Sequence, residues 1–590
     1  MRLARTGGLL IFAASGVIAA CGHLPMDLLP LDEPELTAEA GVPPLDASGL
    51  DGARGDGDID PPRDGGDPPD EDGGPIKDAG CGRDCTGLFV SEALGDDKNA
   101  GTSVAPFRTL KRAFEGIKGG RTVDTIYVSG GKYTDKVTLV EGVSMEGAYV
   151  CPKDKAPCDW SVRDFNLKSE ILNLDAEGVL APKNITRKTV FKGFRVRGGG
   201  SVLATTVFGS VGITLVGAPS LVTNEVFAGD VSSGPAQRRR SIGIVVTGGG
   251  DVPEGPAIDD CFVQGGDAAE QSIGLLMDRV VTTSLLTANA TVTRSIITGG
   301  KALASTAVYA SNSGTATVLD DNTLSGGTSS GDGTGTSVGA SWAIVVSSAM
   351  TITRNRINVP PTDANPPVQC ALGMLVFCGG IHSTGSRMII ANNYIGGARG
   401  SKSAAIVLTD GEDTTRRVVI NSNVLSGAGI KGQPLSTALV VKSSHGNKVT
   451  IGEVKNNILL GGFADARHAI YEEAPEGGEA HLVALDYNDF FFNSGGFQPG
   501  DVAYRGWDPV QNAPRPLTYA ELPTELSTPP PNNIFKLDPE LIGSPPMRLS
   551  PSSPLINLGP EPANDQDAPK IDFENDKRTN KLDIGADEVK

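Results

Sequence analysis

Residues Asn423-Val-Leu-Ser-Gly427 and, 34 positions later, Asn457-Ile-Leu-Leu-Gly461 are two copies of one short pattern. The pattern is a polar residue, an apolar residue two positions later and usually Gly four positions later. It recurs with a mean spacing of (489 − 194)/9, about 33 residues. Its centres are Phe194, Glu225, Cys261, Ser295, Asn322, Asn355, Asn393, Asn423, Asn457 and Asp489. No copy is long enough to bury its own apolar residues, so the copies must stack.

A second pattern alternates with the first without a skip. It consists of Ser, any residue, Gly or Ala, and an aliphatic residue. It begins at Ser210, Ser241, Ser272, Ser305, Ser341, Cys378, Ser403, Ser436 and Arg467. Helical repeats of this length would show a 3.6-residue apolar period, which is absent here. The two patterns therefore predict an all-β solenoid, a parallel β-helix of about a dozen coils.

The run Asn322, Asn355, Asn393, Asn423 and Asn457 resembles the asparagine ladder of the pectin-lyase-like superfamily of right-handed parallel β-helices. Asn tolerates a left-handed backbone, and stacked amides can hydrogen-bond from coil to coil. Cys261 falls in the same column, where we expect a buried free thiol.

The first and last parts of this region resemble those of bacterial β-helix surface lipoproteins. The residues that carry this resemblance are 95–102, 105–110, 553–557 and 583–588. The resemblance covers about residues 86–590 and implies a right-handed parallel β-helix. We expect Leu110 to Ile117 to form a short amphipathic helix that caps the open end. Because this fold carries lyases, hydrolases, adhesins and non-enzymes, the resemblance implies little about activity.

The N-terminus has the layout of an export signal. Arg2 and Arg5 precede an apolar run from Leu9 to Ala20, which is too short to span a bilayer. Ile18-Ala-Ala-Cys21 resembles a bacterial lipobox, which implies a signal peptide at residues 1–20 and a lipid attached to Cys21. The following Gly22 favours the outer membrane. The alternative is an ordinary secreted protein with a coincidental Cys.

Composition divides the rest of the chain. Residues 21–85 are rich in Asp, Gly and Pro and should form a disordered acidic tether. The predicted β-helix with its cap occupies residues 86–500, and residues 501–590 form a Pro-rich closing segment. The net charge of 51 − 70 = −19 argues against nucleic-acid binding.

The cysteines agree with an oxidising compartment. Apart from Cys21 and Cys261, six remain as three local pairs, which predict the disulfides Cys81–Cys85, Cys151–Cys158 and Cys370–Cys378. Zinc is the alternative, but the spacings are not Cys-x₂-Cys and no His cluster lies beside them.

One group of residues approaches a catalytic constellation. Asp259-Asp260 and Asp320-Asp321 precede ladder positions on two coils, and Arg294 stands before the ladder position between them. Paired carboxylates around an Arg are the residues that a polysaccharide lyase or a glycoside hydrolase would need. Asp260, Arg294, Asp321 and Arg354 alternate in sign on successive coils, however. That alternation favours a ladder of charges satisfied between neighbouring coils.

Two features suggest ligand binding. One is an outward strand column that contains Thr214, Val245, Leu276, Tyr309, Val345, His382, Val407, Val440 and Tyr471. The other is Arg238-Arg239-Arg240, the one basic run in the repeat region, which could hold an acidic polysaccharide. The alternatives are ordinary β-branched strand residues and a solvated loop. The longest insertions, 229–240, 328–340 and 358–377, all follow the ladder strand and should emerge on one side.

No metal site or cofactor is predicted. Asp572-x-Glu574-x-Asp576 followed by Asp583 resembles a calcium loop, but Lys577 replaces the Gly that such a loop needs. The sequence favours a membrane-anchored protein that binds polysaccharide or another envelope component without catalysis. The alternatives are a polysaccharide lyase or glycoside hydrolase acting on acidic polysaccharide, and a purely structural envelope protein.

Overall fold

The computed structural model describes residues 87–589, all of which belong to one compact unit, residues 62–590. The undescribed stretches within this range are 152–156, 174–176, 200–208, 232–239, 249–254, 279–286, 312, 330–339, 359–376, 385–386, 399–401, 410–417, 429–433, 443–448, 474–479, 493–500, 509–512, 518–531, 536, 543–547, 562–568 and 579–580. The predicted signal peptide, Cys21, the tether and the Cys81–Cys85 pair lie outside the described residues.

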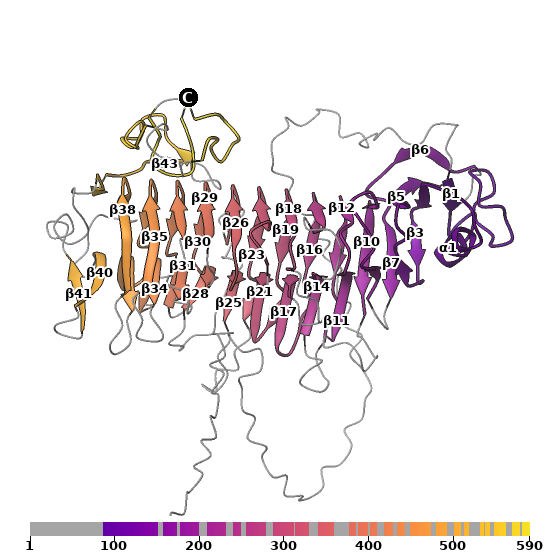
Figure 1. Ribbon diagram of the computed structural model, residues 1–590, viewed down its shortest axis with the longest axis horizontal. Coiled ribbons are helices and arrows are strands. Elements are labelled where there is room, and N and C mark those ends of the chain that lie inside the picture. The colour runs from indigo at the N-terminus through magenta and orange to yellow at the C-terminus, as the bar shows by residue number, and fades with distance from the viewer. Residues whose placement is uncertain are drawn as a thin grey trace, which may run out of the picture. The chain divides into compact units, whose positions relative to one another are not determined.

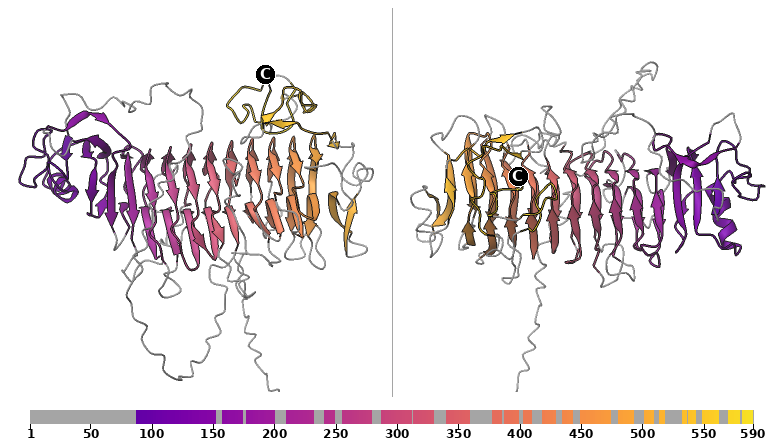
Figure 2. Two further views of the ribbon diagram at one scale, coloured as in Figure 1. Left: turned by 180° about the vertical axis from the view of Figure 1, so that it is seen from behind. Right: turned by 90° about the horizontal axis from the view of Figure 1, so that it is seen from above.

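The chain winds through three long parallel sheets, A, B and C, in a fixed order, so that each coil adds one strand to each sheet (Figure 1; Figure 2). Sheets of 14, 13 and 13 strands confirm the predicted parallel β-helix of about a dozen coils.

Sheet A has a main path of thirteen strands, beside which β6 (Asp159–Arg163) pairs with β5. The strands on this path are β1 (Gly87–Val90), β2 (Thr125–Ser129), β5 (Ser144–Val150), β9 (Val190–Lys192), β12 (Ser220–Val222), β15 (Ala257–Asp259), β18 (Thr291–Thr293), β22 (Val318–Asp320), β26 (Met350–Thr353), β29 (Met388–Ala391), β32 (Val419–Asn421), β35 (Val449–Lys455) and β38 (Ala480–Asp486).

Sheet B follows sheet A across a tight turn. Its strands are β3 (Gly131–Tyr133), β7 (Ser169–Asn173), β10 (Phe194–Gly198), β13 (Glu225–Phe227), β16 (Phe262–Gln264), β19 (Ile296–Thr298), β23 (Thr323–Ser325), β27 (Arg356–Ile357), β30 (Tyr394–Gly396), β33 (Val424–Ser426), β36 (Ile458–Leu460), β39 (Asp489–Phe491) and β42 (Ile534–Phe535).

Sheet C completes each coil. Its strands are β4 (Val137–Thr138), β8 (Val179–Ala181), β11 (Ser210–Leu215), β14 (Arg240–Val246), β17 (Gln271–Met277), β21 (Ala304–Ala310), β25 (Ser341–Val346), β28 (Phe377–Ser383), β31 (Lys402–Thr409), β34 (Leu435–Lys442), β37 (Ala466–Glu473), β40 (Val502–Asp508) and β41 (Ala513–Leu517). Two short pairs lie apart: β20 (Lys301–Ala302) with β24 (Thr328–Ser329), and β43 (Leu541–Ile542) with β44 (Arg548–Leu549).

The turn from sheet A to sheet B carries the predicted asparagine ladder. Each ladder amide accepts from the backbone N–H and the side-chain amide of the preceding ladder residue: Asn423 Oδ1 lies 2.9 Å from Asn393 N and 3.0 Å from its Nδ2. The ladder is longer than predicted, because it continues through Asn457 to Asn488 and Asn533. The predicted ladder is therefore confirmed and extended.

Two ladder positions were predicted one residue too late. Asn224, and not Glu225, accepts from Phe194 N at 3.0 Å, and Asn488, and not Asp489, accepts from Asn457 N at 3.0 Å. The left-handed residue is also different from the expected one. It is the residue before the ladder position: Asp260, Arg294 and Asp321 have φ of 51°, 48° and 55°. The ladder side chain itself turns inward.

The Ser-x-Gly/Ala-aliphatic pattern marks an irregular position in sheet C. Strand pairing skips Gly243 and Gly274, and in β25 both Ala343 and Ile344 are fully buried in the core. Two consecutive residues thus point inward, so the first must be small. A Cβ at Gly212 would lie 2.6 Å from Gly243 O and from Val226 Cγ1.

The Ser of this pattern hydrogen-bonds to residues that stand five positions after an inward ladder residue, here Gly229, Gly266 and Gly300. Ser241 Oγ donates to Gly229 O at 2.8 Å and accepts from Gly266 N at 2.9 Å, and it is fully buried. Ser272 accepts from Gly300 N at 2.6 Å in the same way. These bonds satisfy backbone N–H and C=O groups at the turn from sheet B to sheet C, where the hydrogen bonds between parallel strands end.

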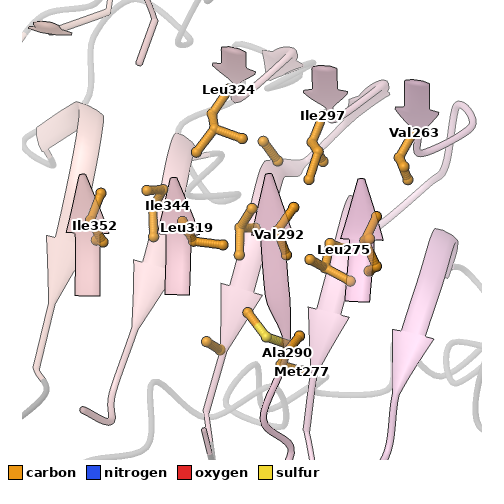
Figure 3. Packing of buried hydrophobic residues seen from close by; sticks show 14 of the residues in the cluster. Val263, Leu275, Met277, Ala290, Val292, Ile297, Leu319, Leu324, Ile344 and Ile352 are labelled. Carbon is orange, nitrogen blue, oxygen red and sulfur yellow. The ribbon is translucent and has the colours of Figure 1, made fainter. Parts of the chain in front are cut away.

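The core is one continuous cluster inside the coils, in which equivalent residues of successive coils stack (Figure 3). Val263, Ile297 and Leu324 of sheet B form one such column. Val292, Leu319 and Ile352 form the equivalent column of sheet A. Each of these side chains is essentially fully buried, and burying one of this size contributes about 1.5–3 kcal/mol.

The predicted capping helix is confirmed as α1 (Leu110–Lys118), at the N-terminal end of the stack (Figure 1). Thr109 caps it by accepting from Arg112 N, and Asp97 in turn accepts from Thr109 N at 2.9 Å. Leu110 and Ala113 turn into the core, so the helix covers apolar residues that an open end would expose.

The cysteine predictions are confirmed in part. Cys151 and Cys158 form a disulfide, and Cys261 is a buried free thiol. Burial raises the pKa of Cys261 to about 12. Cys378 is disulfide-bonded, while its predicted partner Cys370 lies outside the described residues.

The closing segment has two parts in the structure. Strands β40 and β42 extend sheets C and B beyond residue 500, and β41 runs antiparallel along the last edge of sheet C. Pro516 of β41 is exposed and has no N–H, which makes this edge a poor template for another strand. Later residues pack instead against the outer face of sheet B; they are Leu549, Leu555, Phe573, Ile584 and Ala586.

Candidate functional site

Two ion pairs join neighbouring coils at the turn from sheet A to sheet B. We call their residues, Asp259, Arg294, Asp320 and Arg354, the Asp/Arg column. Arg294 Nε donates to Asp259 Oδ1 at 3.1 Å and its Nη2 to Asp259 Oδ2, while Thr293 Oγ1 donates to the same carboxylate at 2.6 Å. In the second pair, Arg354 Nε donates to Asp320 Oδ1 at 2.9 Å and Arg354 Nη2 donates to Asp320 Oδ2. The strand-end carboxylate is therefore held bidentately by the turn Arg of the next coil.

The second Asp of each doublet has a different environment. Asp260 is exposed and accepts from Thr223 Oγ1 at 3.1 Å. Asp321 is half-buried, and desolvation raises its pKa, against the opposing effect of Arg354. The pKa of Arg294 is raised by its hydrogen bond to Asp259. Such a guanidinium is a poor general base, because it keeps its proton.

The second candidate is the outward column of sheet C, which we call the C column. Its strand register runs Val245, Leu276, Tyr309, Val345, His382, Val407, Val440, Tyr471, Arg505. The prediction that Tyr309, His382 and Tyr471 share one outward column is thus correct. All three are half-buried, whereas Val407 and Val440 between them are buried. At about 4.8 Å per coil, Tyr309 and Tyr471 lie roughly 24 Å apart.

Aromatic and basic groups gather along the C column. The ring of His382 stacks on Trp342 at 5.1 Å, and the ring of Tyr471 lies 5.5 Å from His468. The Arg505 guanidinium lies 5.3 Å from the Tyr471 ring. Such flat apolar faces with flanking donors can stack on a sugar ring and hydrogen-bond to its hydroxyls.

His382 of the C column and His468 beside it are neutral near pH 7. Desolvation lowers the pKa of His382 to about 4, with a contribution from Lys442. Desolvation and Arg505 lower the pKa of His468 to about 4. His382 Nε2 lies 3.2 Å from Thr409 Oγ1. At neutral pH these rings can donate or accept hydrogen bonds, but they are not poised to act as general acids.

The basic run is largely outside the described residues, which include Arg240 but not Arg238 or Arg239. Arg240 begins β14 and is 8% exposed, so it belongs to the sheet and not to a solvated loop. The long insertions 229–240, 328–340 and 358–377 all connect a strand of sheet B to a strand of sheet C. Most of their residues are outside the described part.

The calcium-loop resemblance is not reflected in the geometry. Asp572 Oδ1 accepts from Glu574 N at 3.0 Å and from Asp576 N at 2.7 Å, so this carboxylate orders its own loop. Within the described residues no group of three or more His, Cys, Asp or Glu side chains could hold a metal ion. No helix in that part of the chain is long and apolar enough to cross a membrane.

Comparisons with known proteins found no matching family model and no matching curated protein. Among solved structures, XylC in complex with xylose is 10% identical over 85% of this chain and 98% of its own, with a TM-score of 0.37. Pectate lyase Pel9A is 12% identical over 86% and 98%, with a TM-score of 0.33. Bacteriophage CBA120 tailspike protein 3 is 9% identical over 73% and 68%, with a TM-score of 0.31. The likeness extends no further than the fold, which the parallel sheets already establish.

Proposed function

We propose that this protein is a membrane-anchored, extracytoplasmic β-helix lipoprotein that binds a polysaccharide or another envelope component along the C column, without catalysis. The observation that carries the binding proposal is the alignment of Tyr309, His382 and Tyr471, all half-buried, on one column of sheet C. An extended ligand lying along the coil axis could contact all three, as a glycan chain would.

The Asp/Arg column supports binding over catalysis. Asp259 and Asp320 each already hold an Arg bidentately, so neither is free to take a proton or a metal ion without breaking an ion pair. A lyase or hydrolase acting at this column would need Asp260 or Asp321 as its titrating group. We keep that reaction as the alternative function.

Binding can be tested with the full chain and a panel of acidic and neutral polysaccharides, by isothermal titration calorimetry. Tyr471→Ala should weaken binding about 10-fold, because loss of an aromatic contact of about 1–1.5 kcal/mol corresponds to that change in Kd. Ile389→Ala, on the exposed outer face of sheet A, is the matched control and should leave Kd unchanged.

The same incubations decide the alternative when their products are analysed by mass spectrometry. Unsaturated oligosaccharides would identify a lyase, and products that have gained water would identify a hydrolase. Cleavage that Asp321→Ala abolishes in a folded protein would overturn the non-catalytic proposal. Binding unaffected by Tyr471→Ala and Tyr309→Ala would remove the C column as the site.

The anchoring part of the proposal rests on Cys21 at the end of the apolar run. Cells fed a radiolabelled fatty acid should incorporate the label into the wild-type chain, and Cys21→Ser should abolish incorporation and leave the protein outside the membrane fraction. Label retained by the Cys21→Ser variant would show that Cys21 is not the acylated residue.

A further inference from the structure

The outer face of sheet B is covered over its C-terminal coils by the chain's own C-terminus. Tyr394, Val424 and Ile458 follow one another in register on β30, β33 and β36. With Leu460 they form an apolar strip. The residues that pack on this strip come from the C-terminal segment, which we define as residues 548–589; they are Leu549, Leu555, Phe573, Ile584 and Ala586.

The C-terminal segment also makes polar contacts with the turns beside the strip. Arg578 Nη2 donates to Asn392 Oδ1 at 3.1 Å, and Gly585 N donates to Asn456 O at 2.8 Å. Gly585 has a left-handed φ of 112°, and a Cβ there would lie 2.8 Å from Ile458 Cδ1. The segment therefore fits the strip closely at this point.

The interface between the C-terminal segment and sheet B nevertheless holds more acidic than basic groups, and some of its buried polar atoms have no hydrogen-bond partner. Asp572, Glu574, Asp583, Asp587 and Glu588 of the segment gather there, and the cations that face them are Arg548 and Arg578 of the segment with Arg354 and Arg356 of the β-helix. Among the described residues, buried Tyr394 Oη, Asp587 Oδ1 and both polar atoms of the Asn456 side chain have no hydrogen-bond partner. Each such atom would regain water if the segment moved away, which favours opening.

We propose that the C-terminal segment is a pH-dependent clasp, closed over the Tyr394–Val424–Ile458 strip in mildly acidic solution and increasingly released toward neutral pH. Its release would expose the apolar strip while leaving the coils intact, because none of the described residues between 548 and 589 belongs to a strand of the three sheets.

The direction of this pH dependence follows from two carboxyl groups, those of Asp587 and Glu588. Desolvation and the nearby Glu574 and Asp572 raise the pKa of Asp587 to about 6, against Arg548. Desolvation raises the pKa of Glu588 to about 7, against the ion pair in which Arg578 Nη1 lies 3.0 Å from Glu588 Oε2, and Asp583 and Asp572 add to the shift. Tyr394 faces Asp587 and Glu574 from the β-helix. Released into water, the two carboxyls lose the desolvation that is the largest cause of both shifts, so their pKa values fall toward about 4.

The docked segment therefore holds protons that the released segment gives up. Docking is strongest below about pH 4 and weakens as pH rises to about 6 for Asp587 and about 7 for Glu588. A two-unit difference at one carboxyl corresponds to about a 100-fold change in the opening equilibrium. The second carboxyl acts in the same direction, though coupled to the first.

Hydrogen exchange of the full chain, followed by mass spectrometry at pH 4.5 and 7.5 and corrected for intrinsic exchange, tests the clasp. Peptides from residues 569–578 and 581–589 should open at least about 30-fold more readily at pH 7.5. Peptides from β22 and β23, which the segment does not cover, should keep the same protection at both values and serve as the internal control.

Variants separate the clasp from a general effect of pH. Asp587→Asn combined with Glu588→Gln mimics the protonated forms, so the pH difference should fall below about 3-fold. Gly585→Ala should open the segment at both pH values, and Glu561→Gln, at an exposed residue, should behave as wild type. Equal protection of the wild-type segment at both values, or an undiminished pH difference in the double variant, would overturn the proposal.

Discussion

Asn423→Ala should destabilise the protein by about 3–5 kcal/mol, about a third of the free energy of unfolding of an ordinary domain. The fully buried Asn423 side chain donates to Ile390 O at 2.9 Å and Asn421 O at 3.0 Å, and to Asn457 Oδ1 at 2.9 Å. It also accepts two hydrogen bonds from Asn393. Truncation removes all of these bonds and leaves the buried Asn393 N–H without its acceptor and without access to water.

Urea unfolding followed by circular dichroism would measure this loss. The matched control is Asn166→Ala, at an exposed turn residue, which should change stability by no more than about 0.5 kcal/mol. Asn423→Asp adds a sharper comparison, because the carboxylate can still accept from Asn393 but cannot donate to Ile390 O. A stable Asn423→Asp variant would show that the donor half of the ladder contributes little.

Asp501→Ala should destabilise the protein by about 3–5 kcal/mol, because it removes the carboxylate partner of a buried guanidinium. Arg467 Nε donates to Asp501 Oδ1 at 2.7 Å, and the two side chains are only 5% and 1% exposed. The Arg467 guanidinium also lies 5.8 Å from the Phe492 ring. Neither group can recover its hydration while the last coils stay folded.

The chain contains its own control for this prediction. Arg294 and Asp259 form the same bidentate contact between successive coils, but the Arg294 side chain is 62% exposed. Asp259→Ala should therefore lower stability by no more than about 1 kcal/mol. Equal losses from Asp501→Ala and Asp259→Ala, measured by the same urea titration, would show that burial does not set the contribution of these pairs.

The ladder could be predicted because its residues recur on every coil, yet its register was wrong at two positions. Around Glu225 and Asp489 the apolar residue that should stand two positions after the centre can be read one residue out of register, since Val226 and Phe227, like Phe490 and Phe491, are both apolar. Only the backbone shows that the left-handed turn residue is Thr223 or Tyr487, which places Asn224 and Asn488 inward.

The candidate site was predictable to the same degree. The alternation of Asp and Arg indicated charge pairing between coils, and the register of sheet C placed Tyr309, His382 and Tyr471 together as predicted. The sequence could not show that Asp259, and not Asp260, meets Arg294. That choice depends on which residue takes the left-handed turn and points away from the next coil.

The sequence by itself determined the solenoid, its period, its capping helix and the columns that line its core, because each coil repeats the same contacts with its neighbours at a nearly constant chain separation. Tertiary structure alone decided the contacts that do not repeat from coil to coil. Gly585 N donates to Asn456 O from a distant part of the chain. Arg578 meets Asn392 from 186 residues away. Such contacts are set by where the chain returns in space, and neither residue type nor spacing marks them beforehand.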